Sequence, residues 1–236
     1  MPKKYLTLLF ILSVVITGLF SFCTHPEDSR FISYTADPSQ IVMYYKDDAG
    51  NRYGSLGNLK SALHKKGKTL LFSMNGGMYK PDHSPQGLYI ENYKTISPID
   101  TASGTGNFYL KPNGVFYIDT NNKAHIATTP KFNAATVKYA TQSGPMLVVN
   151  GVIHAAFKEG SANLQVRNGV GILPDGKAIF AMSKEKINFH DFALYFKNLG
   201  CKNALYLDGF VSRAYCPEQN HIQTDGDFGV IIGIVK

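Results

Sequence analysis

Short apolar runs separated by turn residues make up most of the chain after its N-terminal region. Each run covers a few positions and is bounded by Gly, Pro, Asn or Asp, the usual composition of turns between β-strands. Asn150-Gly151 stands between two such runs and predicts a hairpin turn. The pattern predicts strands at 41–45, 69–74, 87–90, 108–110, 115–119, 146–149, 170–173, 178–182, 204–207 and 229–235.

Helical periodicity is much rarer than the strand pattern. The clearest segment is 189–199, which has phenylalanines on one face at helical spacing, Asn188 as its expected cap and Gly200 at its end. Weaker patterns cover 59–66 and 132–139. Because many short strands occur with few helices and without regular strand–helix alternation, we predict an α+β fold. Its core is expected to be a mixed, mainly antiparallel β-sheet.

The N-terminus has the composition of a segment that enters a membrane. Lys3 and Lys4 precede an unbroken apolar run over 5–22, the pattern of a secretory signal, and this run approaches the ~20 residues of a membrane helix. Three interpretations stay open: a cleaved signal peptide, an uncleaved anchor, and a lipoprotein signal with Cys23 as the lipidated residue. Phe22 departs from the last pattern, which normally has a small residue there. All three carry the rest of the chain across a membrane, so we expect an extracytoplasmic protein, either secreted or attached to a bacterial cell envelope.

One domain is expected to follow this segment. We assign 1–23 to the signal or anchor, and the polar stretch 24–40 to a tether. The remaining residues, 41–236, are numerous enough and, in a chain with 44% hydrophobic residues, apolar enough to form a core of their own.

The net charge is positive but dispersed. The chain has 24 Lys and Arg residues against 17 Asp and Glu, a net charge of +7, and no arginine-rich stripe. A nucleic-acid-binding face normally concentrates such residues on one element, so we expect no nucleic-acid partner. A mild positive field does favour the approach of an anionic substrate.

Two cysteines, Cys201 and Cys216, follow the N-terminal segment. A tight turn at Asp208-Gly209 would place them opposite each other across a hairpin, within reach of a disulfide bond. The other interpretation is that both are small buried apolar residues.

Polar residues beside glycine, at the ends of predicted strands, are the main candidates for chemistry. Gly-x-Ser-x-Gly, His-Glu-x-x-His, Walker and Cys-x-x-Cys motifs are absent from the sequence. The candidates form four motifs, at 73–79, 142–146, 165–171 and 204–209.

Two of these motifs suit the binding of an anion. Asn75 precedes Gly76 and Gly77, which let backbone N–H groups approach a ligand closely. Arg167 would supply a planar, two-pronged grip on phosphate or carboxylate. A tight turn and a solvated arginine are the ordinary alternatives.

Carboxylates supply the other candidate groups. Asp208 ends an apolar strand, where it would either enter a cleft or form a plain turn. Asp191 is the nearest second carboxylate, although its position also suits support of a helix cap. Residues 225–227, Asp-Gly-Asp, are interpreted as a loop, and we predict neither a metal nor a cofactor.

Taken together and in this order, the motifs resemble the phosphodiester glycosidase family over about 53–234. The most specific pieces are Asn75-Gly76-Gly77-Met78-Tyr79, Gln142-Ser143-Gly144-Pro145-Met146, Arg167-Asn168-Gly169-Val170-Gly171 and Ala204-Leu205-Tyr206-Leu207-Asp208-Gly209. One departure is clear. The animal branch of the family continues the aspartate as Asp-Gly-Gly-Gly-Ser, whereas this chain has Phe210 and Val211 before Ser212, which should reshape that side of the cleft.

The resemblance implies hydrolysis of a sugar-1-phosphodiester, such as an α-N-acetylglucosamine-1-phosphodiester, to a free sugar and a phosphomonoester. Catalytic roles are implied for Asp208, Arg167 and Asp191. Substrate binding is implied for Asn75, Gly76, Gly77, Gln142, Ser143, Gly144, Asn168, Gly209 and Ser212. The expected partner is therefore a carbohydrate or sugar phosphate.

Two alternatives remain open from the sequence. One is a glycan-binding domain without catalysis, which would use exposed aromatic rings. The other is an ordinary glycosidase with a pair of carboxylates, Asp208 and Asp191 being the first candidates. An enzyme should bring Asn75, Arg167 and Asp208 into one pocket, whereas a glycan-binding domain could have them scattered.

Overall fold

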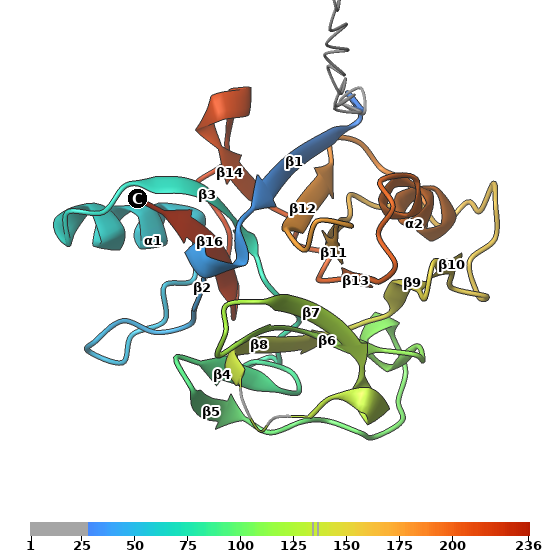
Figure 1. Cartoon of the computed structure of the whole chain (residues 1–236). Helices are drawn as coiled ribbons and strands as arrows, with labels where there is room; N and C mark the ends of the chain where they lie inside the picture. Colours follow the sequence, from blue (N-terminus) through green and yellow to red (C-terminus); the bar gives the residue numbers. More distant parts are fainter. Residues whose placement is uncertain (1–27, 134, 136) are drawn as a thin grey trace, which may run out of the picture.

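Three antiparallel sheets form the protein, and the computed structural model describes residues 28–133, 135 and 137–236. We name each sheet after one of its inner strands. The β11 sheet and the β3 sheet lie side by side, and the β8 sheet lies below them in the view of Figure 1.

The bounds and order of the strands are as follows. The β11 sheet is formed, in spatial order, by β1 (Phe31–Ala36), β12 (Ala178–Ser183), β11 (Asn168–Ile172), β13 (Ala204–Tyr206), β9 (Met146–Val149) and β10 (Val152–Ile153). The β3 sheet is formed by β15 (His221–Ile222), β14 (Ala214–Cys216), β3 (Leu70–Asn75), β16 (Ile231–Val235) and β2 (Ile41–Tyr44). The β8 sheet is formed by β5 (Lys94–Ser97), β4 (Tyr89–Glu91), β8 (Val137–Ser143), β6 (Gly114–Asp119) and β7 (Ala124–Thr128).

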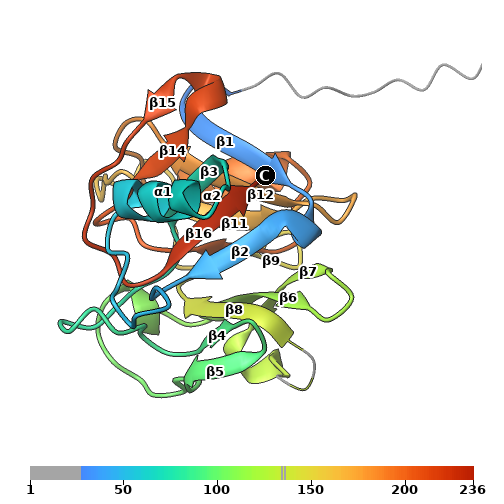
Figure 2. The same ribbon diagram turned by 90° about the vertical axis from the view of Figure 1, so that its left-hand side faces the viewer.

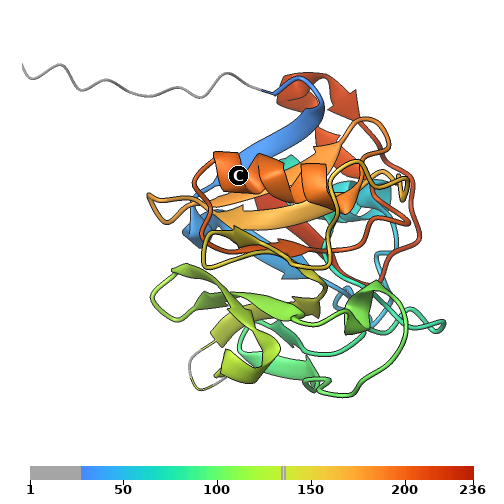
Figure 3. The same ribbon diagram turned by 90° about the vertical axis from the view of Figure 1, so that its right-hand side faces the viewer.

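Each of the two upper sheets is covered by one α-helix. Helix α1 (Leu56–Lys65) begins at Ser55, whose hydroxyl accepts a hydrogen bond from the N–H of Asn58, and its leucines pack on the β3 sheet (Figure 2). Helix α2 (Phe189–Asn198) covers the β11 sheet (Figure 3). Short 3₁₀ turns occupy η1 (Pro38–Gln40), η2 (Asn107–Tyr109), η3 (Thr129–Lys131) and η4 (Pro217–Gln219).

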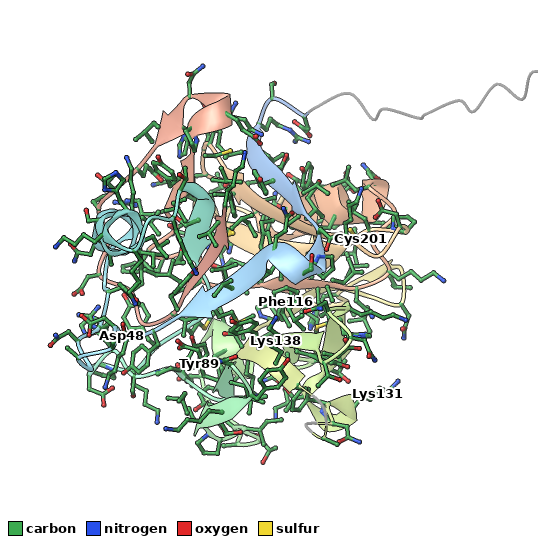
Figure 4. All side chains as sticks on the ribbon, turned by 60° about the vertical axis from the view of Figure 1, so that its left-hand side comes forward. Asp48, Tyr89, Phe116, Lys131, Lys138 and Cys201 are labelled. Atoms are coloured by element: carbon green, nitrogen blue, oxygen red, sulfur yellow. The ribbon has the colours of Figure 1, made fainter. Side chains whose placement is uncertain are left out.

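The main core lies where the three sheets meet. Phe180 of β12 stacks on Phe72 of β3 with a centroid distance of 5.7 Å, and meets the ring of Phe116 of β6 edge-on at 5.8 Å. All three rings are fully buried, and Phe116 is labelled in Figure 4. Aromatic pairs at these distances stabilise a core beyond the effect of buried area alone. Phe180 therefore connects all three sheets.

The predicted fold class is confirmed. Every strand pair of the described residues is antiparallel, and the two α-helices match the predicted segments 59–66 and 189–199 to within a few residues. The predicted cap is present, since Asn188 accepts a hydrogen bond from the N–H of Asp191 at 2.8 Å. The hairpin at Asn150-Gly151 is present too, with positive φ at both residues.

The prediction of a tether over 24–40 is wrong for its second half. Residues 31–36 form β1, an edge strand whose six residues pair with β12. Phe31 and Ile32 are buried, although polar Ser33 and Thr35 hide this pattern in the sequence. The domain thus begins at Phe31 and not at Ile41. The membrane segment predicted at 1–23 lies outside the described residues, and no helix within them is long and apolar enough to cross a membrane.

Two smaller predictions are also corrected. The segment 132–139 is not a helix, because 137–143 pair as β8 with β6 and β4. The segment 108–110 is not a strand but part of the η2 turn.

The hairpin proposed to join Cys201 and Cys216 does not form. Strand β13 pairs with β11 and β9, whereas β14 pairs with β3 and β15. Cys201 and Cys216 are not joined by a disulfide bond, and both are buried. Cys201 packs under α2 and Cys216 lies in the main core, so the interpretation as small buried residues holds.

Phe180→Ala should lower the free energy of unfolding by about 3–5 kcal/mol, because it leaves a cavity at the meeting point of the sheets. Urea denaturation of the full-length protein measures this. The matched control is Phe210→Ala, which removes the same atoms from a side chain that is 90% exposed and should change stability by about 0.5 kcal/mol or less. Equal effects of the two substitutions would contradict the assignment of the core.

Candidate functional site

Two buried asparagines hold the candidate site together. The side-chain nitrogen of Asn168 donates to the side-chain oxygen of Asn75 at 2.9 Å, and its oxygen accepts from the N–H of Asp208 at 2.8 Å. The Asn75 nitrogen donates to the carbonyl of Asp208 at 2.9 Å, while its oxygen also accepts from the N–H of Arg213 at 3.0 Å. We call this set of four residues the amide cluster.

The topology explains why these residues meet. Asn75 is the last residue of β3 and Asn168 the first of β11, so each stands at an end of one of the two upper sheets. The loop 207–213 leaves β13 of one sheet and enters β14 of the other, and it passes between the two asparagines. Both asparagines are fully buried, and buried polar groups need partners. The loop backbone supplies them.

The carboxylate of Asp208 is the reactive group that this arrangement presents. Its side chain is partly buried, and one oxygen accepts a hydrogen bond from the N–H of Phe210 at 3.3 Å. Burial raises the pKa of Asp208 to about 7, although the Phe210 N–H opposes the shift. A carboxyl group of this kind is present in both protonation states near neutral pH and is suited to proton transfer.

A tyrosine supports the same loop from below. The hydroxyl of Tyr206 interacts with the N–H of Gly209 and with Arg167. Burial raises the pKa of Tyr206 to about 12, with the neighbouring Arg167 charge acting against this shift. A Cβ atom at 209 would overlap the Tyr206 hydroxyl and would lie 2.8 Å from the carbonyl of Val166. Gly209 is therefore required by close contact.

Arg167 does not have the exposed position that an anion grip needs. Its side chain is 1% exposed, and its guanidinium lies 3.6 Å from the ring centroid of Phe189. Its Nε donates to the carbonyl of Ile187 at 2.8 Å, and one terminal nitrogen donates to the carbonyl of Asn163 at 2.9 Å. Because its donors are used inside the protein, the expected direct contact with phosphate is contradicted. Arg167 instead holds Tyr206 below the Asp208 loop.

Several predicted ligand-binding groups are also used internally. The N–H of Gly76 donates to the carbonyl of Val230 at 2.8 Å and does not face an anion. A Cβ at Gly77 would lie 2.5 Å from the hydroxyl of Thr141, so this glycine permits close packing between sheets. Asn75 uses its amide in the amide cluster and holds the loop instead of a sugar.

The 142–144 motif divides into two parts. The side chain of Gln142 binds backbone groups of Leu88 and Asp100 at 2.6–2.9 Å, away from Asp208. Ser143 does reach the site, because its hydroxyl donates to the carbonyl of Leu207 at 2.5 Å. Gly144 packs tightly, with its missing Cβ only 2.7 Å from that of Asn113.

Ser212 closes the loop at its other end. Its hydroxyl donates to the carbonyl of Asp208 at 3.2 Å. The loop 207–213 is thus braced by Ser143, Tyr206 and Ser212 in addition to the amide cluster.

Asp191 is a cap residue and not a partner of Asp208. Its carboxylate accepts from the side-chain nitrogen of Asn188 at 2.9 Å and lies 3.3 Å from His190. It borders a cleft with Arg30 and Lys184, and no interaction joins it to Asp208 within the described residues. The candidate carboxylate pair of an ordinary glycosidase is therefore not supported.

Sequence reasoning missed two residues of the site. Arg213 belongs to the amide cluster through its N–H, and its side chain, 38% exposed, pairs with Asp225 at 2.8 Å. Its position directly after Ser212 could have indicated it. Tyr79 lies close enough for the Asp208 charge to act on it; burial chiefly raises the pKa of its phenol, and that charge adds to the shift.

The loop 225–227 serves to hold charges in place. Asp225 pairs with Arg213, and Asp227 pairs with Arg52 at 2.7 Å and with His83 at 2.9 Å. His83 in turn stacks on the ring of Tyr79.

Comparison with known proteins identifies the class to which this fold and site belong. The family model for phosphodiester glycosidases matches residues 68–233, so the chain belongs to the phosphodiester glycosidase family. The uncharacterized protein YigE of Escherichia coli (strain K12) is 39% identical over 186 residues, which cover 78% of this chain and 73% of YigE.

Two solved structures have a similar fold. The catalytic domain of zebrafish N-acetylglucosamine-1-phosphodiester α-N-acetylglucosaminidase has a TM-score of 0.58 and 13% identity, covering 89% of this chain and 85% of that one. A hypothetical protein from Synechocystis has a TM-score of 0.53 and 13% identity, covering 87% of this chain and 59% of that one. At these identities the likeness concerns the fold alone.

Gly209→Ala should lower the free energy of unfolding by about 1–3 kcal/mol, because its methyl group would overlap the Tyr206 hydroxyl. The double variant Gly209→Ala with Tyr206→Phe removes that hydroxyl and should recover part of the loss. A double-mutant cycle by urea denaturation measures the coupling. Strictly additive effects would mean that the two residues do not touch.

Proposed function

We propose that this protein hydrolyses a sugar-1-phosphodiester outside the cytoplasm, releasing a free sugar and a phosphomonoester. Membership of the phosphodiester glycosidase family supports the reaction class. The observation that carries the proposal for this chain is the single partly buried carboxylate of Asp208, held at the junction of two sheets with a pKa of about 7.

Asp208 acts in its ionised form. As the bond between the sugar and the phosphate breaks, positive charge develops at the anomeric carbon, and the Asp208 carboxylate either stabilises this charge or activates the attacking water. The leaving group is a phosphate, whose second pKa is about 6. It therefore needs less help from a general acid than the alcohol released by an ordinary glycosidase.

Arg213 takes the anion-binding role first expected of Arg167. It stands five residues after Asp208 on the same braced loop. Its side chain is 38% exposed; Nε donates to Asp225 and Nη1 to the carbonyl of Ser212. The other terminal nitrogen is left to donate to a phosphate oxygen. Tyr79, on the loop after β3, lies within range of the Asp208 charge and is the second candidate for contact with substrate.

The extracytoplasmic location is part of this proposal and depends on the segment 1–23. The apolar run over 5–22 after two lysines supports it. Attachment through an uncleaved anchor or through lipid on Cys23 would keep the enzyme at the envelope surface.

The direct test is release of free sugar by the full-length protein in a polyoxyethylene detergent. The substrate is the methyl phosphodiester of α-N-acetylglucosamine-1-phosphate. Asp208→Asn should lower kcat by about 10²–10⁴-fold. Asp175→Asn, on an exposed turn, is the matched control. Asp191→Asn should retain activity, and its loss would instead favour a glycosidase with two carboxylates. No release from several sugar-1-phosphodiesters by folded protein would make glycan binding the leading function.

The rate should rise with pH through about 7. Because the pKa of Asp208 is raised to about 7, the carboxylate is mostly protonated at pH 5.5 and mostly ionised at pH 8.5. If the ionised form acts, kcat/KM increases across this window and then levels. A profile of kcat/KM against pH checks this, and a fall across the same window would assign Asp208 as a general acid instead.

Arg213→Ala should raise KM for the methyl phosphodiester by about 10–100-fold, because one charge-assisted hydrogen bond to the phosphate is lost. Lys94→Ala removes one positive charge from an exposed position on β5 and serves as the control. Unchanged KM in Arg213→Ala, with an intact fold by circular dichroism, would refute the anion-binding role.

A further inference from the structure

Residues of α1, β14 and the segments beside them line a basic cleft. Figure 2 shows α1 on the outer side of the β3 sheet. The cleft has a volume of about 600 Å³. Three lysines and a histidine line it, together with hydroxyl and amide side chains, and Tyr215 of β14 and Thr224 border it on the side of the sheet. No carboxylate is among the lining residues. We define the basic cleft by Lys60, His64, Lys65, Lys68, Tyr215 and Thr224.

The positive charges of the cleft are not neutralised. Within the described part of the chain, Lys60, Lys65 and Lys68 form no ion pair, whereas the neighbouring Lys66 pairs with Asp48 at 2.7 Å. Asp48 is labelled in Figure 4 on the α1 side of the molecule. The ammonium group of Lys60 lies 5.1 Å from the ring centroid of Tyr215, which holds it at the sheet side of the cleft.

The helix dipole does not account for this set of charges. Cations in the last turn of a helix are favoured by the macrodipole, and this explains His64 and Lys65. Lys60 is in the middle of α1 and Lys68 lies beyond its end, yet both line the same cleft. Binding of an anionic ligand would explain why Lys60, His64, Lys65 and Lys68 line one cleft.

The cleft adjoins the candidate site. Arg213 stands directly before β14, two residues before Tyr215. Asp225, which pairs with Arg213, follows Thr224, and the carbonyl of Thr224 accepts from the N–H of Gly57 at the start of α1. Arg213 is therefore linked through Asp225 to Thr224, which borders the basic cleft.

We propose that the basic cleft binds further phosphate groups of a polymeric substrate, a glycopolymer whose units are joined by phosphodiesters. This inference rests on the proposed function for its choice of ligand. A small sugar-1-phosphodiester carries one negative charge and needs only Arg213, whereas a row of cations beyond it suits a chain with repeated charge. The single lining aromatic, Tyr215, is covered by Lys60, so the cleft offers no free platform for stacking nucleic-acid bases.

The test is fluorescence anisotropy with a labelled glycerol-phosphate oligomer of about eight units, titrated with full-length protein at several salt concentrations. The oligomer has no sugar-1-phosphate bond, so the proposed reaction does not consume the probe. The cleft variant is Lys60→Gln with Lys65→Gln and Lys68→Gln. The matched control, Lys94→Gln with Lys123→Gln and Lys131→Gln, removes the same charge from exposed positions on or beside the β8 sheet. Lys131, labelled in Figure 4, lies far from α1.

The cleft variant should raise Kd for the oligomer about tenfold or more, and the control about threefold or less. The slope of log Kd against log salt concentration should fall by about 2–3 in the cleft variant, because each cation that contacts a phosphate contributes about 0.7–0.9 to it. Equal weakening by both variants would overturn the proposal, since it would report net charge alone. Absence of binding by the parent protein, or tighter binding of a single-stranded DNA of equal charge, would overturn it as well.

Failure of this inference is distinguishable from failure of the proposed function. Binding of the oligomer is measured without hydrolysis. Hydrolysis is measured with the methyl phosphodiester, which is too small to need the basic cleft. Hydrolysis of the small ester with no binding of the oligomer would leave a phosphodiester glycosidase of small substrates. Specific oligomer binding without any hydrolysis would support the basic cleft as a binding site and refute the proposed hydrolase activity.

Discussion

The contact between two buried side-chain amides is the constraint on which the site depends. Asn75 and Asn168 stand at ends of different sheets, and their hydrogen bonds to each other and to the backbone of Asp208 fix how the sheets meet. Removing one amide would leave the others without partners in a buried place, where an unsatisfied polar group costs about 1–3 kcal/mol. The same hydrogen bonds therefore stabilise the fold and locate the reactive carboxylate.

The loop 207–213 shows how rigidity and reactivity are combined. Its backbone groups are bound by Asn75, Asn168, Ser143, Ser212 and Tyr206. With these groups occupied by the protein, the Asp208 carboxylate and the Arg213 guanidinium are what the loop can offer to a substrate. Burial of the carboxylate raises its pKa to about 7, and this is the property that suits it to proton transfer. Arg167 contributes from behind, through Tyr206.

The surface that we propose to face the substrate follows from the same arrangement. Arg213 is the last residue of the loop, and the strand that it leads into borders the basic cleft along α1. The Phe210 and Val211 positions, where the animal branch of the family is expected to have glycines, add bulk to the loop. Phe210 is 90% exposed, whereas Val211 packs against the cluster under α1. The reaction class can thus be shared with the family while the shape around the substrate differs.

The sequence by itself determined the fold class, most of the strands, both helices and the motifs that meet in the site, because alternation, helical spacing and turn residues are local properties. Asp208, Asn75, Asn168 and Gly209 lie in motifs identified in this way, whereas Ser212 was named only through the resemblance to the family. The role of each residue, in contrast, depends on its tertiary contacts. Arg167 has the residue type of an anion grip, and only the packing of Phe189 and two backbone carbonyls around it decided that it is internal.

The tertiary structure likewise decided that residues 31–36 are a strand, since an edge strand is specified by its partner β12 more than by its own pattern. It also placed Cys201 and Cys216 apart and brought Arg213 to the site. These outcomes depend on which strands pair across long separations in the chain, and a pattern of hydrophobic and polar residues does not specify that pairing.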